Sequence, residues 1–235
     1  MKTNTTLPEG FVYLNDFDPR IKFDIRYHDT HNIFGRPIKN YNKNIPICTL
    51  AAAIALKHAQ DDFEQDGYTI LVYDAYRPIS ACLDMVDWTS ESFTINAGYV
   101  IDFSSRQELF DNNYISDQSS HCRGSTVDLT IIRTEEKNFD PILSYRIIGN
   151  RKIPYYNDGS VDMGTSFDFM GPESHSNYPY LSHEQKESRQ YFINILKKYG
   201  LLNYAVGWED DPQEWWHFTL ANEPFPETNF DFPIE

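Results

Sequence analysis

The sequence lacks long apolar runs and paired cysteines. No uninterrupted apolar stretch approaches the ~20 residues that a membrane span needs, and the start, MKTNTTLPEG, lacks the apolar segment of a secretory signal. The three cysteines, Cys48, Cys82 and Cys122, include no C-x-x-C pair, which argues against a disulfide framework or a thiolate zinc site. These features predict a protein of a reducing compartment, the cytoplasm, with the periplasm as the alternative if a signal peptide once preceded this sequence.

Basic residues are also scarce. Lys and Arg number 20 against 35 Asp and Glu, which gives a formal charge of −15 and a pI near 4.8. Such a charge repels a phosphate backbone, so nucleic acid is not an expected partner. Internal repeats and low-complexity segments are absent as well, which argues against solenoids and disorder. With 235 residues, 40% of them hydrophobic, the chain is expected to form one domain over residues 1–235, of unknown oligomeric state.

Helices and short strands are expected to alternate irregularly, which is typical of the α+β class. Helices are predicted where strong helix formers follow a capping Ser or Thr, or where apolar residues recur at helical spacing. Strands are predicted where short runs are apolar and β-branched or aromatic. The predicted helices are 49–64, 79–98 and 182–199, and the predicted strands are 68–73, 124–132 and 214–220. The polar segment 133–162 is expected to be a long excursion from the core.

The segment SSHCRGSTVDL carries His121 and Asp128 on either side of Gly124. The glycine and the β-branched residues favour a loop that runs into a strand, so the two side chains converge only if the chain turns at Gly124. An imidazole and a carboxylate are two ligands of a catalytic zinc site, which usually takes three from the protein and leaves one position for water. The third ligand must come from elsewhere in the chain.

The segment EWWHF places Glu214 three residues before His217. On a strand this spacing puts the two side chains on opposite faces, so both reach one metal only at a bend or a strand end. His217 would then be the third ligand, and Glu214 would accept the proton of water. In YDAYRP, Arg77 follows a predicted strand, where a permanently charged guanidinium can stabilise an oxyanion.

Simpler interpretations of the same residues stay open at this point. A single histidine is more often a surface or hydrogen-bonded residue than a ligand. Arg77 alone is more often the ion-pair partner of a carboxylate such as Asp74. Trp215 and Trp216 are most simply core residues or the wall of a pocket. The metal site therefore depends on the motifs taken together.

The combination of SSHCRGSTVDL and EWWH resembles the zinc D-alanyl-D-alanine dipeptidases of the vancomycin-resistance type, a group related to D,D-carboxypeptidases. KFDIRYHDTHNIFGRPIKNY, YDAYRP, SFDFM and EPFPETNFDFP resemble the same pattern in the same order. The resemblance implies an α+β fold with a small central, mostly antiparallel sheet, flanking helices and a zinc site at the sheet. Two segments, 133–162 and WEDDPQ, look longer than in the compact members and are expected to reshape the mouth of the site.

The resemblance also implies a role for each catalytic residue. One Zn²⁺ per chain would be bound by His121, Asp128 and His217. Glu214 would be the general base, and Arg77 would stabilise the transition state.

Four further residues are implied to bind a small dipeptide by its charged ends. Asp168 and the backbone carbonyl of Tyr27 would hold the free ammonium group. Ser119 and the region of Tyr41 would hold the free carboxylate.

The expected activity is hydrolysis of D-Ala-D-Ala, or of a similar small D-dipeptide, to free D-amino acids. A D,D-carboxypeptidase of cell-wall peptides is the nearest alternative, but an acidic anchor at Asp168 argues against it. A metal-binding module without turnover would need neither Glu214 nor Arg77. A glycosidase with two carboxylates would leave His121 and His217 unexplained.

Overall fold

A five-stranded sheet forms the centre of the protein. The computed structural model describes residues 7–90, 98–100, 103, 105–136, 141–204 and 212–235. Within these ranges only one strand pair of the central sheet, β2 with β4, is parallel, so the expected small, mostly antiparallel sheet is confirmed. The strand order is β2 (Lys22–Phe23), β4 (Tyr68–Asp74), β5 (Thr126–Arg133), β9 (His217–Leu220) and β8 (Leu201–Leu202).

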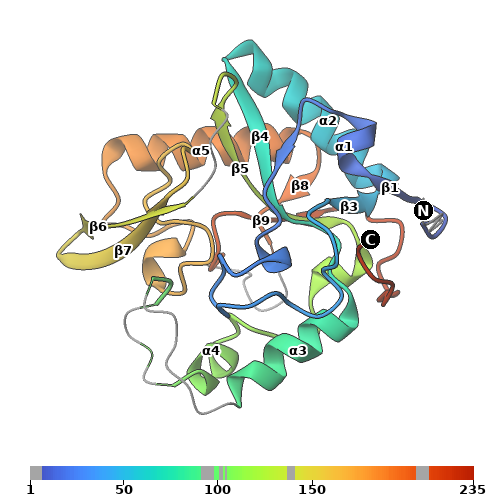
Figure 1. Ribbon diagram of the computed structural model, residues 1–235. Coiled ribbons are helices and arrows are strands. Elements are labelled where there is room, and N and C mark those ends of the chain that lie inside the picture. Colours follow the sequence, from blue (N-terminus) through green and yellow to red (C-terminus); the bar gives the residue numbers. More distant parts are fainter. Residues whose placement is uncertain (1–6, 91–97, 101–102, 104, 137–140, 205–211) are drawn as a thin grey trace.

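Two long helices pack against each other and against the sheet. Helix α2 (Leu50–Gln65) contacts β4, and helix α5 (His183–Lys198) contacts β8 (Figure 1). Both begin where the sequence predicts, because Thr49 caps α2 and Ser182 forms a capping box with Gln185 at α5. The α+β class is thereby confirmed. No helix in the described ranges has the length and apolar character needed to cross a membrane.

Short elements that the sequence analysis did not predict complete the fold. They connect the larger elements and bring the two ends of the described chain together, since the hydroxyl of Tyr13 donates to the backbone oxygen of Glu235 at 2.9 Å. The elements are β1 (Phe11–Tyr13), which pairs with β3 (Ile47–Thr49), α1 (Leu14–Phe17), α4 (Gln107–Asp111) and the 3-10 helices η1 (Arg26–His28), η2 (Ser120–Arg123) and η3 (Pro172–Ser174).

Helix α3 (Ile79–Thr89) differs from its prediction in its extent. It begins at the expected residue but ends at Thr89, and positions 91–97 of the predicted helix lie outside the described residues. Leu83 is 50% exposed, because the helix turns Cys82 and Met85 inward. The Sγ atom of Cys82 lies 3.4 Å from that of Cys122, so these two cysteines are neighbours although they are far apart in the sequence.

The segment predicted as a polar excursion contains a β-hairpin. Strands β6 (Ile142–Ile148) and β7 (Arg151–Asn157) form a separate antiparallel pair that extends away from the central sheet in Figure 1. Most of β6 is exposed, including Ile147 at 72%, so its apolar residues face solvent rather than the core. Toward the turn of the hairpin, a second small core consists of Ile148, Ile153, Phe169 and Leu181.

Candidate active site

Three neighbouring strands place a row of polar side chains on one face of the sheet. Asp74 at the end of β4 lies opposite Asp128 on β5, and Asp128 lies opposite His217 at the start of β9. Directly opposed residues in a sheet project to the same face. All three are buried. The register of the sheet therefore brings together residues whose sequence positions are far apart.

His121 joins this row from η2, the turn before β5. Gly124 ends η2 in the left-handed conformation with a φ of 78°, and its N–H donates to the carbonyl oxygen of His121. A Cβ atom at this position would lie 2.2 Å from the ring of Phe11, so both the backbone conformation and the available space require glycine. The predicted turn at Gly124 is confirmed, and it carries His121 toward Asp128.

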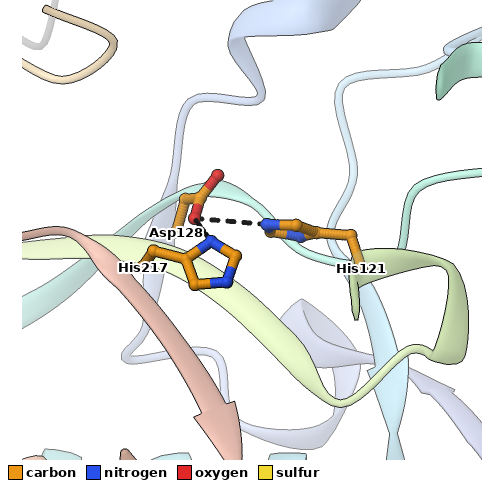
Figure 2. A group of neighbouring side chains, drawn as sticks. All are labelled: His121, Asp128 and His217. Carbon is orange, nitrogen blue, oxygen red and sulfur yellow. Dashed lines mark hydrogen bonds and ion pairs between the residues drawn. The ribbon is translucent and has the colours of Figure 1, made fainter. Parts of the chain in front are cut away.

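His121, Asp128 and His217 form one compact group (Figure 2). Oδ1 of Asp128 lies 3.2 Å from Nε2 of His121 and 3.1 Å from Nδ1 of His217. One potential ligand atom from each residue lies within 4.8 Å of the other two. Two imidazole nitrogens and a carboxylate oxygen are a donor set that suits zinc.

The hydrogen bonding of His121 fits a cation at this place. Its Nδ1 lies 2.7 Å from the carbonyl oxygen of Ala75, which can only accept, so Nδ1 carries the proton. The buried Nε2 then presents a lone pair and has no hydrogen bond with any described residue. Burial disfavours the protonated ring, but the carboxylate of Asp128 outweighs it and raises the pKa of His121. The geometry that attracts a proton also suits a metal ion, with Ala75 orienting the ring.

Asp128 and His217 are held in the forms that metal ligands require. Burial works against the Asp128 carboxylate, but the imidazoles of His121 and His217 keep its pKa below the usual range. Burial lowers the pKa of His217, which favours the neutral ring. The group therefore offers a carboxylate and neutral imidazole nitrogen at neutral pH.

Glu214 lies beside this group at a bend. Strand β9 begins at His217 rather than at Glu214 as predicted, and the bend puts both side chains on one side: Oε2 of Glu214 is 3.7 Å from Nδ1 of His217. Asn203, which the sequence analysis missed, fixes the bend by donating to the backbone oxygens of Glu214 at 2.8 Å and His217 at 2.7 Å. Burial, followed by the charges of Asp128 and Asp168, raises the pKa of Glu214 well above its ordinary value. A raised pKa suits a carboxylate that exchanges protons.

Arg77 is held by Asp74. Its Nε and Nη2 atoms lie 3.0 and 2.8 Å from Oδ2 of Asp74, and Nη2 lies 3.7 Å from Oδ2 of Asp128. The simpler interpretation of Arg77 as an ion-pair partner thus describes a real contact, and the same guanidinium also lies near Asp128 of the candidate metal-binding group. The hydroxyl of Tyr41 donates to Oδ1 of Asp74 at 2.7 Å. Tyr41 therefore supports the buried carboxylate that orients Arg77.

Asp168 is a buried carboxylate with one free oxygen. Its Oδ1 accepts a hydrogen bond from the hydroxyl of Tyr27 at 3.1 Å, and its buried Oδ2 has no hydrogen-bond partner in the described part of the chain. Burial, together with the charge of Asp128, raises the pKa of Asp168 to about 7. The hydroxyl of Tyr27 thus lies against Asp168, and its backbone carbonyl, which was expected to bind the substrate's ammonium group, accepts from the N–H of Ile38 at 2.9 Å.

One cavity connects these groups. Its volume is about 730 Å³, within the range of sites for small molecules. Ser119 lies on its wall and caps η2, since its Oγ accepts from the N–H of His121 at 3.3 Å. The other residues of the predicted site that line it are Tyr27, Arg77, His121, Asp128, Asp168, Glu214 and His217.

Similar proteins match along almost the whole chain. Residues 8–140 and 156–235 match the Peptidase M15 family, described as D-ala-D-ala dipeptidase. The sequence is 30% identical over 230 residues to the D-alanyl-D-alanine dipeptidase of Enterococcus faecalis, covering 97% of this chain and 100% of that protein. The D-alanyl-D-alanine dipeptidase of Streptomyces coelicolor is 30% identical over 226 residues, covering 95% of this chain and 98% of its own. The unmatched gap between residues 140 and 156 holds most of the β6–β7 hairpin.

Proposed function

Because the chain belongs to the D-Ala-D-Ala dipeptidase family, we propose that it is a zinc metallopeptidase that hydrolyses D-Ala-D-Ala, or a closely similar D-dipeptide, to free D-amino acids. The family expected from the motifs is confirmed by the matches. The observation that carries the proposal is the convergence of a three-ligand group, Glu214 and Arg77 on one cavity. We take residues 1–235 to act as one domain and place it in the cytoplasm, which its three free cysteines support.

The zinc end of the site consists of His121, Asp128 and His217, which would hold one zinc ion. When bound, zinc supplies a Lewis acid that polarises a carbonyl oxygen and lowers the pKa of water from about 15.7 to about 7. The chain contributes the donor atoms and fixes their orientation through Ala75 and the register of β5 with β9. Because these contacts are made by backbone groups, the ligands are arranged before the metal arrives.

Glu214 carries the proton in this mechanism. Its carboxylate accepts a proton from the attacking water and delivers it to the nitrogen of the leaving amino acid. Arg77 stabilises the negative charge that develops on the scissile carbonyl oxygen, since its guanidinium stays charged at any working pH. Asp74 keeps the guanidinium in place through two hydrogen bonds to one oxygen.

The amino end of the site consists of Asp168 and Tyr27. The free Oδ2 of Asp168 offers a charged acceptor to the substrate's ammonium group, while Tyr27 holds Oδ1. Ser119 is proposed for the substrate's carboxylate because it lines the same cavity, whereas Tyr41, which does not line it, would act indirectly through Asp74. A site that binds both charged ends of a dipeptide excludes longer peptides.

Three substrates test the proposal. The zinc-loaded protein is incubated with D-Ala-D-Ala, with L-Ala-L-Ala and with an N-acetylated tripeptide that ends in D-Ala-D-Ala, and amine release is measured. Hydrolysis of the first alone is expected. Release of D-Ala from the tripeptide at a rate equal to or above that from D-Ala-D-Ala would instead identify a D,D-carboxypeptidase, and no release from any of them would leave a metal-binding module.

A further inference from the structure

The segment that leads from β7 to Asp168 contains a buried carboxylate that the proposed reaction does not use. Asp158 is only 5% exposed. Its Oδ2 accepts from Nη2 of Arg26 at 2.8 Å and from the hydroxyl of Tyr73 at 2.5 Å. Its Oδ1 accepts from the N–H of Ser160 at 3.1 Å. A buried charge is costly unless it is paired and hydrogen-bonded, so Asp158 and its partners constrain one another strongly.

Both side-chain partners of this carboxylate lead directly to the amino end. The ring of Tyr73 stacks on Phe167, with centroids 4.5 Å apart and an interplanar angle of 19°, and Phe167 immediately precedes Asp168. Arg26 immediately precedes Tyr27, whose hydroxyl donates to Asp168 at 3.1 Å. Asp158 is therefore joined to the proposed ammonium anchor, Asp168, in two ways. One leads through Phe167, the backbone neighbour of Asp168, and the other through Tyr27, its hydrogen-bond donor.

Asp168 has a backbone conformation that needs such support. Its φ is 60°, in the left-handed region that residues other than glycine rarely adopt. Phe169, on its other side, packs with Ile148 and Ile153 toward the turn of the hairpin. Phe169 is thus fixed by two residues of the hairpin. Phe167 is fixed by Tyr73, which is a hydrogen-bond partner of Asp158.

We infer that Asp158 is a positioning residue for the amino end: through Tyr73 and Arg26 it fixes Phe167 and Tyr27, and so sets where the free oxygen of Asp168 meets the substrate's ammonium group. The inference rests on the proposed function, because a position for Asp168 matters only if Asp168 binds the ammonium. It extends that function by assigning specificity for the free amino group to a residue that does not touch the substrate.

The test compares D-Ala-D-Ala with propanoyl-D-alanine, which is the same molecule without the ammonium group. Asp158→Asn is expected to raise KM for D-Ala-D-Ala about tenfold, below the roughly 100-fold that a 1 Å misplacement can cost, with kcat within about twofold. Its kcat/KM for propanoyl-D-alanine should not change. Tyr73→Phe keeps the ring on Phe167 and removes the bond to Asp158, so a smaller rise in the same direction is expected even if Asp158→Asn fails to fold.

Asp162→Asn is the matched control, since Asp162 is a half-exposed carboxylate of the same segment that pairs with Arg146. It should change neither substrate. Equal losses for both substrates in Asp158→Asn and Tyr73→Phe, or no loss in either, would overturn the inference. Asp168→Asn separates this outcome from a failure of the proposed function: if that substitution lowers kcat/KM equally for both substrates, the ammonium anchor itself is wrong, and if it lowers kcat/KM for D-Ala-D-Ala alone, only the positioning role has failed.

Discussion

The zinc end and the amino end of the site are held in different ways. At the zinc end, Asp128 and His217 are opposed residues of paired strands, and His121 is oriented by a backbone carbonyl. At the amino end, Asp168 lies on a loop in a left-handed conformation, and its contacts come from side chains such as Tyr27. Backbone hydrogen bonds in a sheet do not depend on the identity of neighbouring side chains, whereas the amino end depends on each of its partners.

This difference separates the reaction from the choice of substrate. The internal gap in the family match holds most of the hairpin, and the hairpin packs against Phe169 beside the amino end. We therefore expect substitutions at the zinc end to abolish turnover and those at the amino end to change which substrates bind.

The largest effect is expected from removing the metal or one of its ligands. His217→Ala should leave the protein with zinc content and activity near background, because three protein ligands become two. The parent protein should contain one zinc ion per chain and lose its activity to a chelator. His183→Ala is the control, since this histidine is an exposed residue of α5. Elemental analysis that finds no zinc in the parent after zinc-supplemented purification would contradict the assignment of the ligands.

Glu214→Gln tests the zinc end without removing a ligand. The amide keeps the shape of the side chain but cannot accept a proton, so kcat should fall about 10²- to 10⁴-fold while zinc content stays unchanged. Glu187→Gln, at an exposed position of α5, should leave kcat as it is. A variant that retains zinc and near-normal kcat would require another base.

Asp168→Asn tests the amino end. Losing one charge-assisted contact costs about 1.5–3 kcal/mol, which lowers kcat/KM for D-Ala-D-Ala roughly 10- to 150-fold. Propanoyl-D-alanine, which has no ammonium group, should lose little. A lowered melting temperature together with equal losses for both substrates would instead make Asp168 a structural residue of its loop.

The features that the sequence predicted correctly are those with local signals. The long helices have strong local signals, such as the caps at Thr49 and Ser182, and the ligands lie in compact motifs. Asp74 and Asn203 were not assigned to the site because their roles arise from strand register and from a bend, which local spacing does not encode. The hairpin was missed because most apolar side chains of β6 face solvent and those of β7 are buried in one block, so neither strand alternates between core and solvent.

Lowering the pH is expected to weaken the amino end in a graded manner. The pKa of Asp168 is raised to about 7, so its charged form, which the ammonium group needs, is lost as the pH falls through that value. The ratio of kcat/KM for D-Ala-D-Ala to that for propanoyl-D-alanine should fall about tenfold for each pH unit well below 7. Protonation of Glu214 or of the proposed metal ligands affects both substrates equally, so it cancels in this ratio. Asp168→Asn should make the ratio independent of pH in this range, and a ratio in the parent that is flat from pH 8 to 5 would remove the charge of Asp168 from substrate binding.

The smallest effect is expected at the outer face of the hairpin. Ile147 is 72% exposed, so Ile147→Ala should leave kcat/KM within about twofold and the free energy of unfolding within about 0.5 kcal/mol. Ile153 belongs to the same hairpin but is fully buried against Phe169, and the same substitution there removes core contacts, which costs about 2–5 kcal/mol. Because that core supports the amino end, Ile153→Ala should also raise KM for D-Ala-D-Ala while sparing propanoyl-D-alanine. Denaturant unfolding and steady-state kinetics of the pair distinguish a hairpin that supports recognition through its buried side chains from one that acts through its exposed face, since the second case would reverse the order of the two variants in KM.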